Sequence, residues 1–168
     1  NAFSDAAVYT ELETYIQSLI GIKDLTIGIT PFFKINNHYV YSDLHNNNSI
    51  LFRHFHSSSE KDEISDYCKL LFRDSDQPLL FETLNEQSLS DVQCLQYYHL
   101  EGARSLIICP LKNKSGIIGM LEVMSTKSKQ LIPGYISKIE PAIPLFTLGC
   151  EKSLEDLNNE VDRVIKKK

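Results

Sequence analysis

The sequence predicts an α+β domain, and three features lead to that fold class. Residues 102–124 hold two apolar, strand-length runs, 106–111 and 117–123, joined by the polar turn 112–116. This pattern predicts an antiparallel hairpin with a loop of about five residues. Each run is apolar at odd and even positions, so the hairpin should lie in the middle of a sheet with both faces covered. Short β-branched runs elsewhere supply further strands, and amphipathic helices are expected at both ends of the chain.

The first elements follow from periodicity and turn residues. Tyr9, Leu12 and Ile16 recur at helical spacing, with Ser4 or Asp5 as the expected N-cap and Gly21 as the end of the helix. Residues 25–33 are β-branched and predict a strand in which Pro31 marks a bend or an edge. Asn36-Asn37 predicts a turn into a second strand, 38–42.

The middle of the chain alternates between predicted strands and helices. Residues 50–56 are expected to form a strand after the polar turn 46–48, and this strand would place His54 and His56 on one face. Two histidines without a nearby third ligand favour a partly exposed strand face over a metal site. The polar loop 57–62 should open a helix that Gln77-Pro78 stops. A short strand, 79–81, and a helix, 89–100, follow.

The last helix is expected to begin near Pro141 and to carry a heptad seam. Its apolar positions alternate by three and four residues: Ile143, Thr147, Cys150, Leu154, Leu157, Val161 and Val164. Packing on its own domain would also explain such a stripe, but residues 151–168 carry few apolar anchors, which suits a two-helix contact better. We therefore expect a homodimer whose interface contains Leu154, Leu157, Val161 and Val164.

Charge and cysteine usage exclude several classes of partner. A formal net charge of −5 argues against a nucleic-acid surface, and the basic run 166–168 is expected to be a solvated helix end. We expect no membrane contact, because no apolar run reaches bilayer length and no secretory leader opens the chain. Cys68, Cys94, Cys109 and Cys150 never form a C-x-x-C pair. They predict a reduced, cytoplasmic domain without disulfides or metal.

The central hairpin resembles the GAF domain. The residues that carry the resemblance are G-A-R-S-L-I-I-C-P-L at 102–111 and I-I-G-M-L-E-V at 117–123. They are similar to that family's pattern of Gly, Arg-Ser, an apolar strand ending in Pro-Leu, a short turn and a strand of the type apolar-Gly-apolar-Leu-Glu. The resemblance implies an antiparallel sheet of five or six strands. It also implies that the N- and C-terminal helices pack on one face, and that a ligand pocket lies beneath the middle helices on the other.

The resemblance also implies a regulatory role within a larger signalling protein. Residues 3–150 would form the sensor domain, residues 151–168 would form a linking helix that starts a coiled coil, and residues 1–2 would be an expression remnant. The domain would sense an unknown small organic ligand and pass the signal through the dimeric helix to an adjoining output domain. The alternative is a dimerisation scaffold of the same fold whose pocket is filled by its own aromatic residues, without a ligand.

Several ligands known for this family are not expected here. Cyclic-nucleotide-binding members carry Asn-Lys after the second hairpin strand, where this chain has Ser125-Thr126. Bilin-binding members attach the pigment through Cys-His, whereas Cys94 is followed by Leu95. Members that reduce free methionine sulfoxide need a cluster of cysteines, and the segment before Arg104 has none nearer than Cys94. We therefore expect no cofactor and no enzymatic activity.

The expected ligand site lies around the start of the hairpin. Tyr97, Tyr98 and His99 would supply hydroxyl and imidazole groups from the preceding helix, although one buried Tyr and surface neighbours would explain them equally. Arg104 would hold an anionic ligand, or pair with Glu101, or cap a helix end. Glu122 lies either near the sheet edge or against a polar pocket, because burial of an unpaired carboxylate is costly. Cys109, in the same hairpin, completes the set of expected ligand-binding residues.

Overall fold

The computed structural model describes residues 6–41, 48–55 and 62–166 and is built on a five-stranded antiparallel sheet in the order β2-β1-β5-β4-β3. The strands are β1 (Thr26–Ile35), β2 (His38–Tyr41), β3 (Leu79–Phe81), β4 (Ser105–Asn113) and β5 (Gly116–Ser125). The helices are α1 (Ala6–Ile20), α2 (Ile50–His54), α3 (Glu63–Phe72), α4 (Glu86–Asp91), α5 (Gln96–Leu100), α6 (Pro133–Ile139) and α7 (Ile143–Lys166). The short 3₁₀ helices are η2 (Gln93–Leu95) and η3 (Glu140–Ala142).

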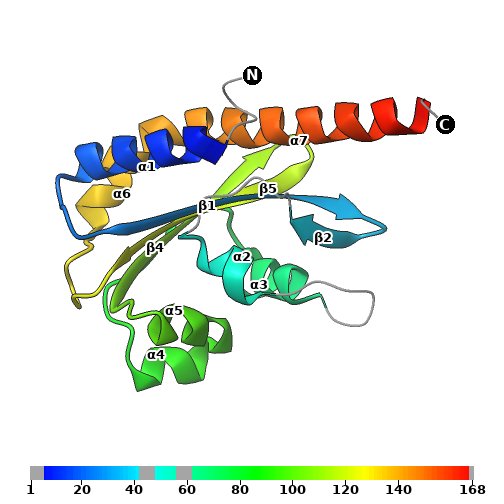
Figure 1. Cartoon of the computed structure of the whole chain (residues 1–168). Coiled ribbons are helices and arrows are strands. Elements are labelled where there is room, and N and C mark those ends of the chain that lie inside the picture. Colours follow the sequence, from blue (N-terminus) through cyan, green and yellow to red (C-terminus); the bar gives the residue numbers. More distant parts are fainter. Residues whose placement is uncertain (1–5, 42–47, 56–61, 167–168) are drawn as a thin grey trace.

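The helices form two layers around the sheet. The terminal helices α1 and α7 lie on one face together with α6, and α2 to α5 lie on the other (Figure 1). Each face of the sheet therefore has a hydrophobic core of its own. The predicted α+β class, the antiparallel sheet and the distribution of helices over its two faces are confirmed.

The central hairpin has the expected place in the sheet. β4 and β5 pair along their whole length, and β5 also pairs with β1, so both strands have neighbours on each side. Their side chains are buried on both faces up to the tip. The loop is shorter than predicted, because the strands continue to Asn113 and Gly116 and a register shift between Leu111 and Lys112 absorbs the difference.

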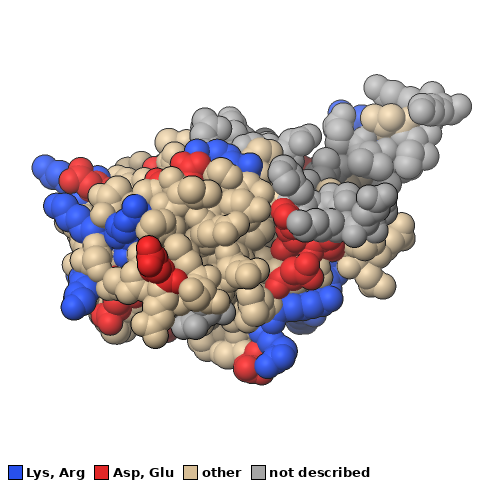
Figure 2. All heavy atoms as spheres, turned by 90° about the horizontal axis from the view of Figure 1, so that it is seen from below, with Lys and Arg blue, Asp and Glu red and all other residues tan. Residues whose placement is uncertain are grey.

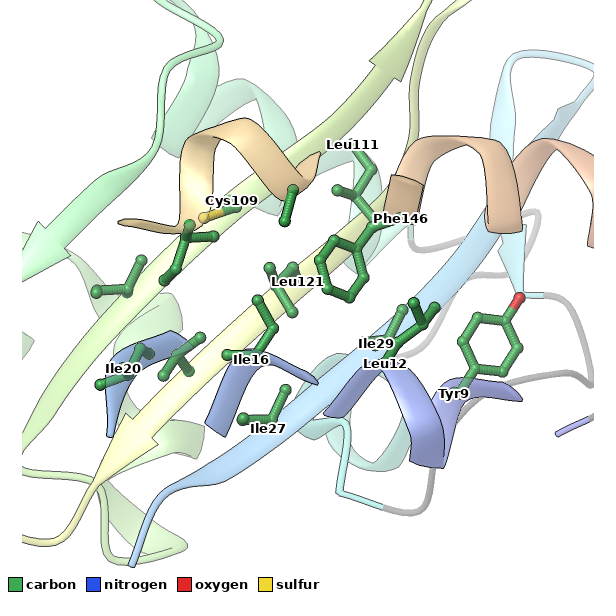
Figure 3. Packing of buried hydrophobic residues seen from close by; sticks show 14 of the residues in the cluster. Tyr9, Leu12, Ile16, Ile20, Ile27, Ile29, Cys109, Leu111, Leu121 and Phe146 are labelled. Atoms are coloured by element: carbon green, nitrogen blue, oxygen red, sulfur yellow. The ribbon is translucent and has the colours of Figure 1, made fainter. Parts of the chain in front are cut away.

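The core under the terminal helices is apolar and closely packed. Residues from α1 and α7 meet residues of the three central strands in this layer, and Figure 3 labels Tyr9, Leu12, Ile16, Ile20, Ile27, Ile29, Cys109, Leu111, Leu121 and Phe146. At Gly119 of β5, a Cβ would lie 2.8 Å from the Cys150 sulfur of α7. A glycine at this position lets α7 approach the sheet closely. The Tyr9 hydroxyl also forms a hydrogen bond with Ser153, which ties α1 to α7.

The β1–β2 hairpin confirms the predicted turn. Asn36 and Asn37 both have positive φ angles, 50° and 67°, as a two-residue turn between twisted strands requires. β1 pairs with β5 up to Pro31 and with β2 from Phe32 onward. Pro31, which has no N–H to donate, therefore stands where the strand changes its hydrogen-bonding neighbour.

Two predicted elements were wrong, and one helix was not predicted. Residues 50–54 form α2 instead of a strand, because the Ser49 hydroxyl caps the helix by accepting a hydrogen bond from the Phe52 N–H at 3.2 Å. The predicted helix 89–100 is broken into α4, η2 and α5, because Val92 has an extended backbone. Helix α6 was not predicted, whereas the last helix, α7, begins at Ile143, close to the expected start near Pro141. His56 and the expected caps Ser4 and Asp5 lie outside the described residues.

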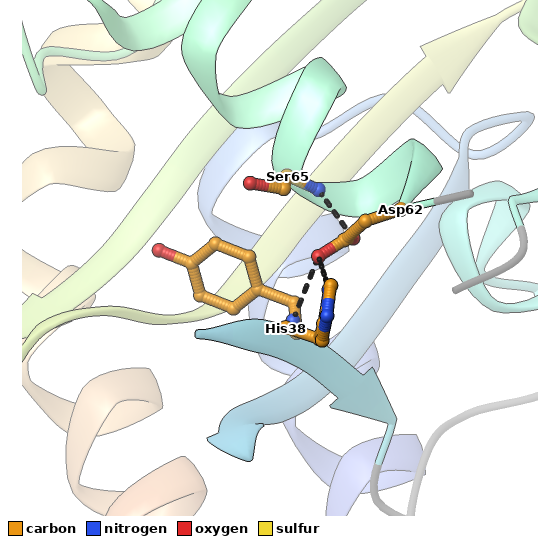
Figure 4. A network of polar contacts seen from close by, with 4 residues as sticks. His38, Asp62 and Ser65 are labelled. Carbon is orange, nitrogen blue, oxygen red and sulfur yellow. Dashed lines mark hydrogen bonds and ion pairs between the residues drawn. The ribbon is translucent and has the colours of Figure 1, made fainter. Parts of the chain in front are cut away.

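Helix α3 begins as predicted, and its N-cap ties it to the edge of the sheet. One oxygen of Asp62 accepts a hydrogen bond from the Ser65 N–H at 2.9 Å. The other lies 3.2 Å from both the Tyr39 N–H and the Nδ1 atom of His38 (Figure 4). Asp62 thus caps α3 and links its start to β2, while buried residues of α3 pack onto the sheet.

Candidate functional site

The sheet face under α2 to α5 carries the second hydrophobic core, and this is the face where the GAF resemblance implies a ligand pocket. Aromatic side chains from β1, β2, α3 and α5, together with Phe55 directly after α2, fill much of it. The buried members are Phe32, Tyr39, Ile50, Leu51, Phe55, Ile64, Tyr67, Cys68, Phe72, Leu84, Leu95, Tyr98, Ala103, Leu106, Ile108, Met120 and Met124. Among the described residues, the face is therefore closed over its centre by the chain's own side chains.

One carboxylate, Glu122, stands in the middle of this apolar layer. It is fully buried on β5, and its backbone neighbours in the sheet are Gly28 of β1 and Ile108 of β4. One of its oxygens accepts a hydrogen bond from the Ser49 hydroxyl at 2.8 Å, and the other accepts one from the Leu51 N–H at 3.1 Å. Both donors belong to the start of α2, so the carboxylate holds that helix onto the sheet.

The network extends through Tyr98 and Tyr67. Tyr98 forms a side-chain hydrogen bond with Glu122, and the Tyr98 and Tyr67 hydroxyls lie 2.8 Å apart. On the other side, the Thr30 hydroxyl donates to the Ser49 oxygen. We call Thr30, Ser49, Tyr67, Tyr98 and Glu122 the Glu122 network. It links β1, β5, α3 and α5 to the residue that caps α2, and every one of its side chains is buried.

Burial sets the charge state of the network. Desolvation raises the pKa of Glu122 from 4.5 to about 7, while hydrogen bonds from Tyr98, Ser49 and the start of α2 oppose this rise. Desolvation also raises the pKa values of Tyr67 and Tyr98 well above 10, so both hydroxyls stay protonated. The carboxyl of Glu122 is thus the group of the network that titrates near neutral pH.

Sequence reasoning singled out Glu122 and Tyr98 but missed their partners. The roles of Ser49 and Thr30 are not predicted, because the sequence indicates a strand at residues 50–56 and hence no helix that Ser49 could cap. Gly28, a glycine inside β1, is the sequence signal that indicates the close approach of Ser49 to this strand. A Cβ at this position would lie 2.6 Å from the Ser49 Cα and 2.8 Å from a Glu122 oxygen. A glycine inside a strand often marks a site where another part of the backbone comes near.

Tyr97 and His99 lie apart from the network. The Tyr97 ring stacks on His54 with ring centres 5.3 Å apart and meets the edge or face of Phe55 at 4.9 Å. His54 in turn lies 2.6 Å from a carboxylate oxygen of Glu101. Tyr97 is half-buried at the surface of α5 and lines a groove between α3 and α5. His99 is half-buried, and its backbone carbonyl accepts a hydrogen bond from Arg104 at 3.0 Å.

The Arg104 side chain forms hydrogen bonds with backbone carbonyl groups. Its guanidinium donates to the carbonyl oxygens of His99 at 3.0 Å and Ala103 at 2.8 Å, at the end of α5. This is the helix-capping alternative among the three that the sequence left open. Glu101, the other candidate partner, pairs with Arg53 and His54 instead.

Cys109 does not share a site with Glu122. It belongs to the core under the terminal helices, where its backbone partner on β5 is Leu121, whereas Glu122 faces α2. The sheet therefore separates the two residues. Burial raises the pKa of the Cys109 thiol to about 12, as it does for Cys68 and Cys94. All four cysteines are free, and their burial disfavours the thiolate form that nucleophilic chemistry requires.

The first half of the heptad seam faces the chain's own sheet. Cys150 is fully buried, and Ile143 and Leu154 pack against the same core. Farther along α7, Val164 is 50 % exposed. The side chains of Leu157 and Val161 lie outside the described residues. The first half of the seam therefore packs inside the domain, whereas Val164, its last described residue, is half exposed.

The described residues, 6–41, 48–55 and 62–166, contain neither a cluster of metal ligands nor a helix that could cross a membrane. No group of three or more His, Cys, Asp and Glu side chains there could hold a metal ion. None of the helices in those ranges has the length and apolar character needed to cross a bilayer.

Comparison with known proteins places the fold. No protein-family model matches the chain, and no curated protein sequence does. Among solved structures, the GAF domain of a two-component sensor histidine kinase from Bacillus halodurans matches with a TM-score of 0.56 at 13% identity, covering 89% of this chain and 95% of that one. A domain of a putative sensor histidine kinase from Sinorhizobium meliloti matches with a TM-score of 0.55 at 13% identity, over 92% and 95% of the two chains.

The similarity also extends to an enzyme. The type II free methionine-R-sulfoxide reductase from Thermoplasma acidophilum matches with a TM-score of 0.52 at 10% identity, over 90% of this chain and 96% of that one. At such low sequence identities, structural similarity shows that two proteins share a fold but does not show that they share an activity. The resemblance that began with the Gly102 hairpin is thereby confirmed over nearly the whole chain: this protein has the fold of a GAF domain.

Proposed function

We propose that the protein is a regulatory domain that senses a small organic ligand on the α2 to α5 side of the sheet and transmits the signal through α7 in a homodimer. The observation that carries the proposal is the position of α7. This 24-residue helix contacts β1, β4 and β5 along its first half, and Asn158, Asn159, Arg163 and Val164 near its end are exposed. One rigid element therefore runs from the central strands out of the domain.

The Glu122 network supports coupling between the two faces. Glu122 and Gly119 lie on the same strand, β5: the first holds α2, and the second is in close contact with α7 at Cys150. A ligand that shifted α2 or α5 would act on β5 through Glu122 and Tyr98. Because packed interiors transmit strain instead of absorbing it, a shift of β5 would reach α7.

The homodimer would form through the end of α7. Leu157, Val161 and Val164 continue the heptad spacing beyond Leu154, which itself packs partly against the core. Leu157→Glu combined with Val161→Glu should convert a dimer into a monomer in light scattering without loss of helical signal. Asn158→Glu with Asn159→Glu adds the same charge at exposed neighbouring positions and should leave the dimer intact. A wild-type protein that stays monomeric at high micromolar concentration would overturn this part of the proposal.

Ligand sensing is tested by a thermal-shift panel of nucleotides, amino acids, organic acids and amines. A ligand that binds the native state stabilises it by mass action and so raises the melting temperature. At a ligand concentration one hundred times Kd, the free energy of unfolding rises by about 2.7 kcal/mol. A specific shift supports sensing, and its loss in Tyr98→Phe would point to the Glu122 network. The absence of any shift across the panel would remove the sensing role.

The filled core under α2 to α5 favours a second candidate, a dimerisation scaffold without a ligand. Phe32, Phe55, Tyr67 and Tyr98 are all buried there, as they would be in a domain whose pocket is occupied by its own side chains. This candidate predicts a dimer by light scattering together with a silent thermal-shift panel.

We propose that the domain is not an enzyme, because Cys68, Cys109 and Cys150 are buried and burial raises the pKa values of the Cys68 and Cys109 thiols to about 12. Four free cysteines support a reducing, cytoplasmic setting. The proposal includes an adjoining output domain in a longer parent chain, and it includes neither nucleic acid nor membrane among the partners.

A further inference from the structure

A groove between α3 and α5 lies on the surface above the filled core. It has a volume of about 310 Å³ and lies between α3 on one side and η2 with α5 on the other. We call it the α3–α5 groove. Its lining residues are Phe55, Glu63, Asp66, Tyr67, Leu70, Gln93, Cys94, Gln96 and Tyr97. The volume is at the lower end of the range that small-molecule sites occupy, so it suits a compact ligand.

The groove has an apolar, aromatic wall. Phe55 and Tyr67 meet edge to face with ring centres 4.9 Å apart, and Tyr97 joins them through Phe55. Tyr97 is also braced by the stacked ring of His54, so its ring is held in place before a ligand arrives. Leu70 extends this surface outward and is 57 % exposed, so its side chain is accessible to a ligand.

The charged side chains that line the groove are all acidic. Glu63, Asp66, Tyr67 and Leu70 recur at helical spacing on one side of α3, which brings two carboxyl groups next to the aromatic wall. No Lys or Arg lines the groove among the described residues. Figure 2 looks onto the face of α2 to α5: most of it is uncharged, and the Lys and Arg side chains stand mainly toward its rim.

We propose that the α3–α5 groove binds a small organic cation, a primary or quaternary amine that carries an apolar body. Aromatic rings attract a positive charge through their electron-rich faces, and carboxyl groups pair with it. The apolar part of the ligand would cover Leu70 and the half-buried ring of Tyr97. Gln93 and Gln96, both exposed on the opposite wall, offer neutral amide oxygens as further acceptors.

This inference rests on the proposed sensing function for its role but can be tested by itself. Three probes with the same aromatic body separate charge from shape: benzyltrimethylammonium, neutral benzyl alcohol and anionic phenylacetate. Titration calorimetry on the whole chain gives each Kd, and nuclear magnetic resonance maps the shifted residues. The cation should bind about tenfold more tightly than the alcohol, the anion should bind weakest, and the shifts should centre on Tyr97 and α3.

Matched variants test the site. Asp66→Lys should raise the Kd for benzyltrimethylammonium about tenfold, because it reverses a charge at the groove. Asp74→Lys makes the same change at a highly exposed carboxyl outside the groove and should change the Kd by less than about twofold. Tyr97→Leu removes the braced ring and should weaken the cation about threefold or more while leaving benzyl alcohol nearly unaffected.

Equal affinity for the three probes would overturn the inference, and so would an Asp66→Lys variant that binds the cation as the wild type does. If cations fail to bind but another member of the thermal-shift panel stabilises the protein, the inference falls and the sensing function stands. If the cation binds in the groove yet leaves α7 unchanged in hydrogen exchange, the site is supported and its proposed signalling role is overturned.

Discussion

Replacement of Glu122 by Gln should change how the stability of the protein depends on pH. The side chain keeps its shape but no longer titrates. In the wild type, burial raises the pKa of Glu122 from 4.5 to about 7 in the folded state, so between these values the folded protein binds more protons than the unfolded chain. The free energy of unfolding therefore falls as the pH rises through this window.

The magnitude follows from the shift. A difference of one pKa unit is worth about 1.36 kcal/mol, so a rise of 2.5 units, from 4.5 to 7, corresponds to about 3 kcal/mol of stability. That stability is fully present below pH 4.5 and is lost above pH 7. Tyr67 and Tyr98 add nothing to this slope, because burial raises their pKa values well above 10. The donors from Ser49 and Leu51 do not titrate in this range.

Urea unfolding followed by far-ultraviolet circular dichroism, at several pH values across this window, measures the effect. The wild type should lose about 3 kcal/mol more than Glu122→Gln between the two ends. The variant itself should be less stable at the acidic end by about 1–3 kcal/mol, since the new amide N–H group faces donors. Glu86→Gln, at an exposed carboxyl at the start of α4, is the matched control and should follow the wild type. Parallel slopes for wild type and Glu122→Gln would refute the reasoning.

Two further predictions concern the packing around this network. Gly28→Ala should destabilise the protein by about 2 kcal/mol or more in the same urea assay, because the new Cβ would lie 2.6 Å from the Ser49 Cα, a backbone atom that cannot move without α2. Gly134→Ala, at a glycine with open space around it, is its control, and equal stability of the two variants would contradict the account. Asp62→Ala should lower the free energy of unfolding by about 1–2 kcal/mol, because it removes the cap of α3 and its contacts with β2. Asp74→Ala, the control, should lower it by about 0.5 kcal/mol or less. If Asp62→Ala leaves the stability unchanged, the cap does not hold α3.

Local patterns predicted much of the fold. The hairpin of β4 and β5, the turn at Asn36-Asn37 and helix α1 each depend on residues that are close in sequence, so their periodicity and turn chemistry were enough. Helix α2 was predicted as a strand because five apolar and basic residues suit either structure. Its helical state depends on Ser49 and on Glu122, whose hydrogen bond spans 73 positions in the chain.

The candidate site was only half accessible to sequence reasoning, and strand register explains why. Cys109 and Glu122 were assigned to one site, but the register pairs Cys109 with Leu121 and Ile108 with Glu122, which turns the two side chains to opposite faces. The register depends on the short loop and the shift at Leu111, and neither feature was predicted. The sequence left Glu122 between a sheet edge and a polar pocket. In the structure, Glu122 lies in the interior of the sheet, where hydroxyl and N–H groups donate hydrogen bonds to its buried carboxylate.

In the proposed function, α7 leaves the domain and pairs with α7 of a second copy. A nitroxide at Val164→Cys, in a Cys94→Ser background that leaves only the buried thiols Cys68, Cys109 and Cys150, reports this contact by dipolar broadening of its continuous-wave electron paramagnetic resonance spectrum. Two packed helices lie about 8–10 Å apart, so we predict a strong, short-range coupling. It should vanish on dilution with unlabelled protein and in the Leu157→Glu, Val161→Glu variant. A labelled protein without coupling at high micromolar concentration would contradict the central claim.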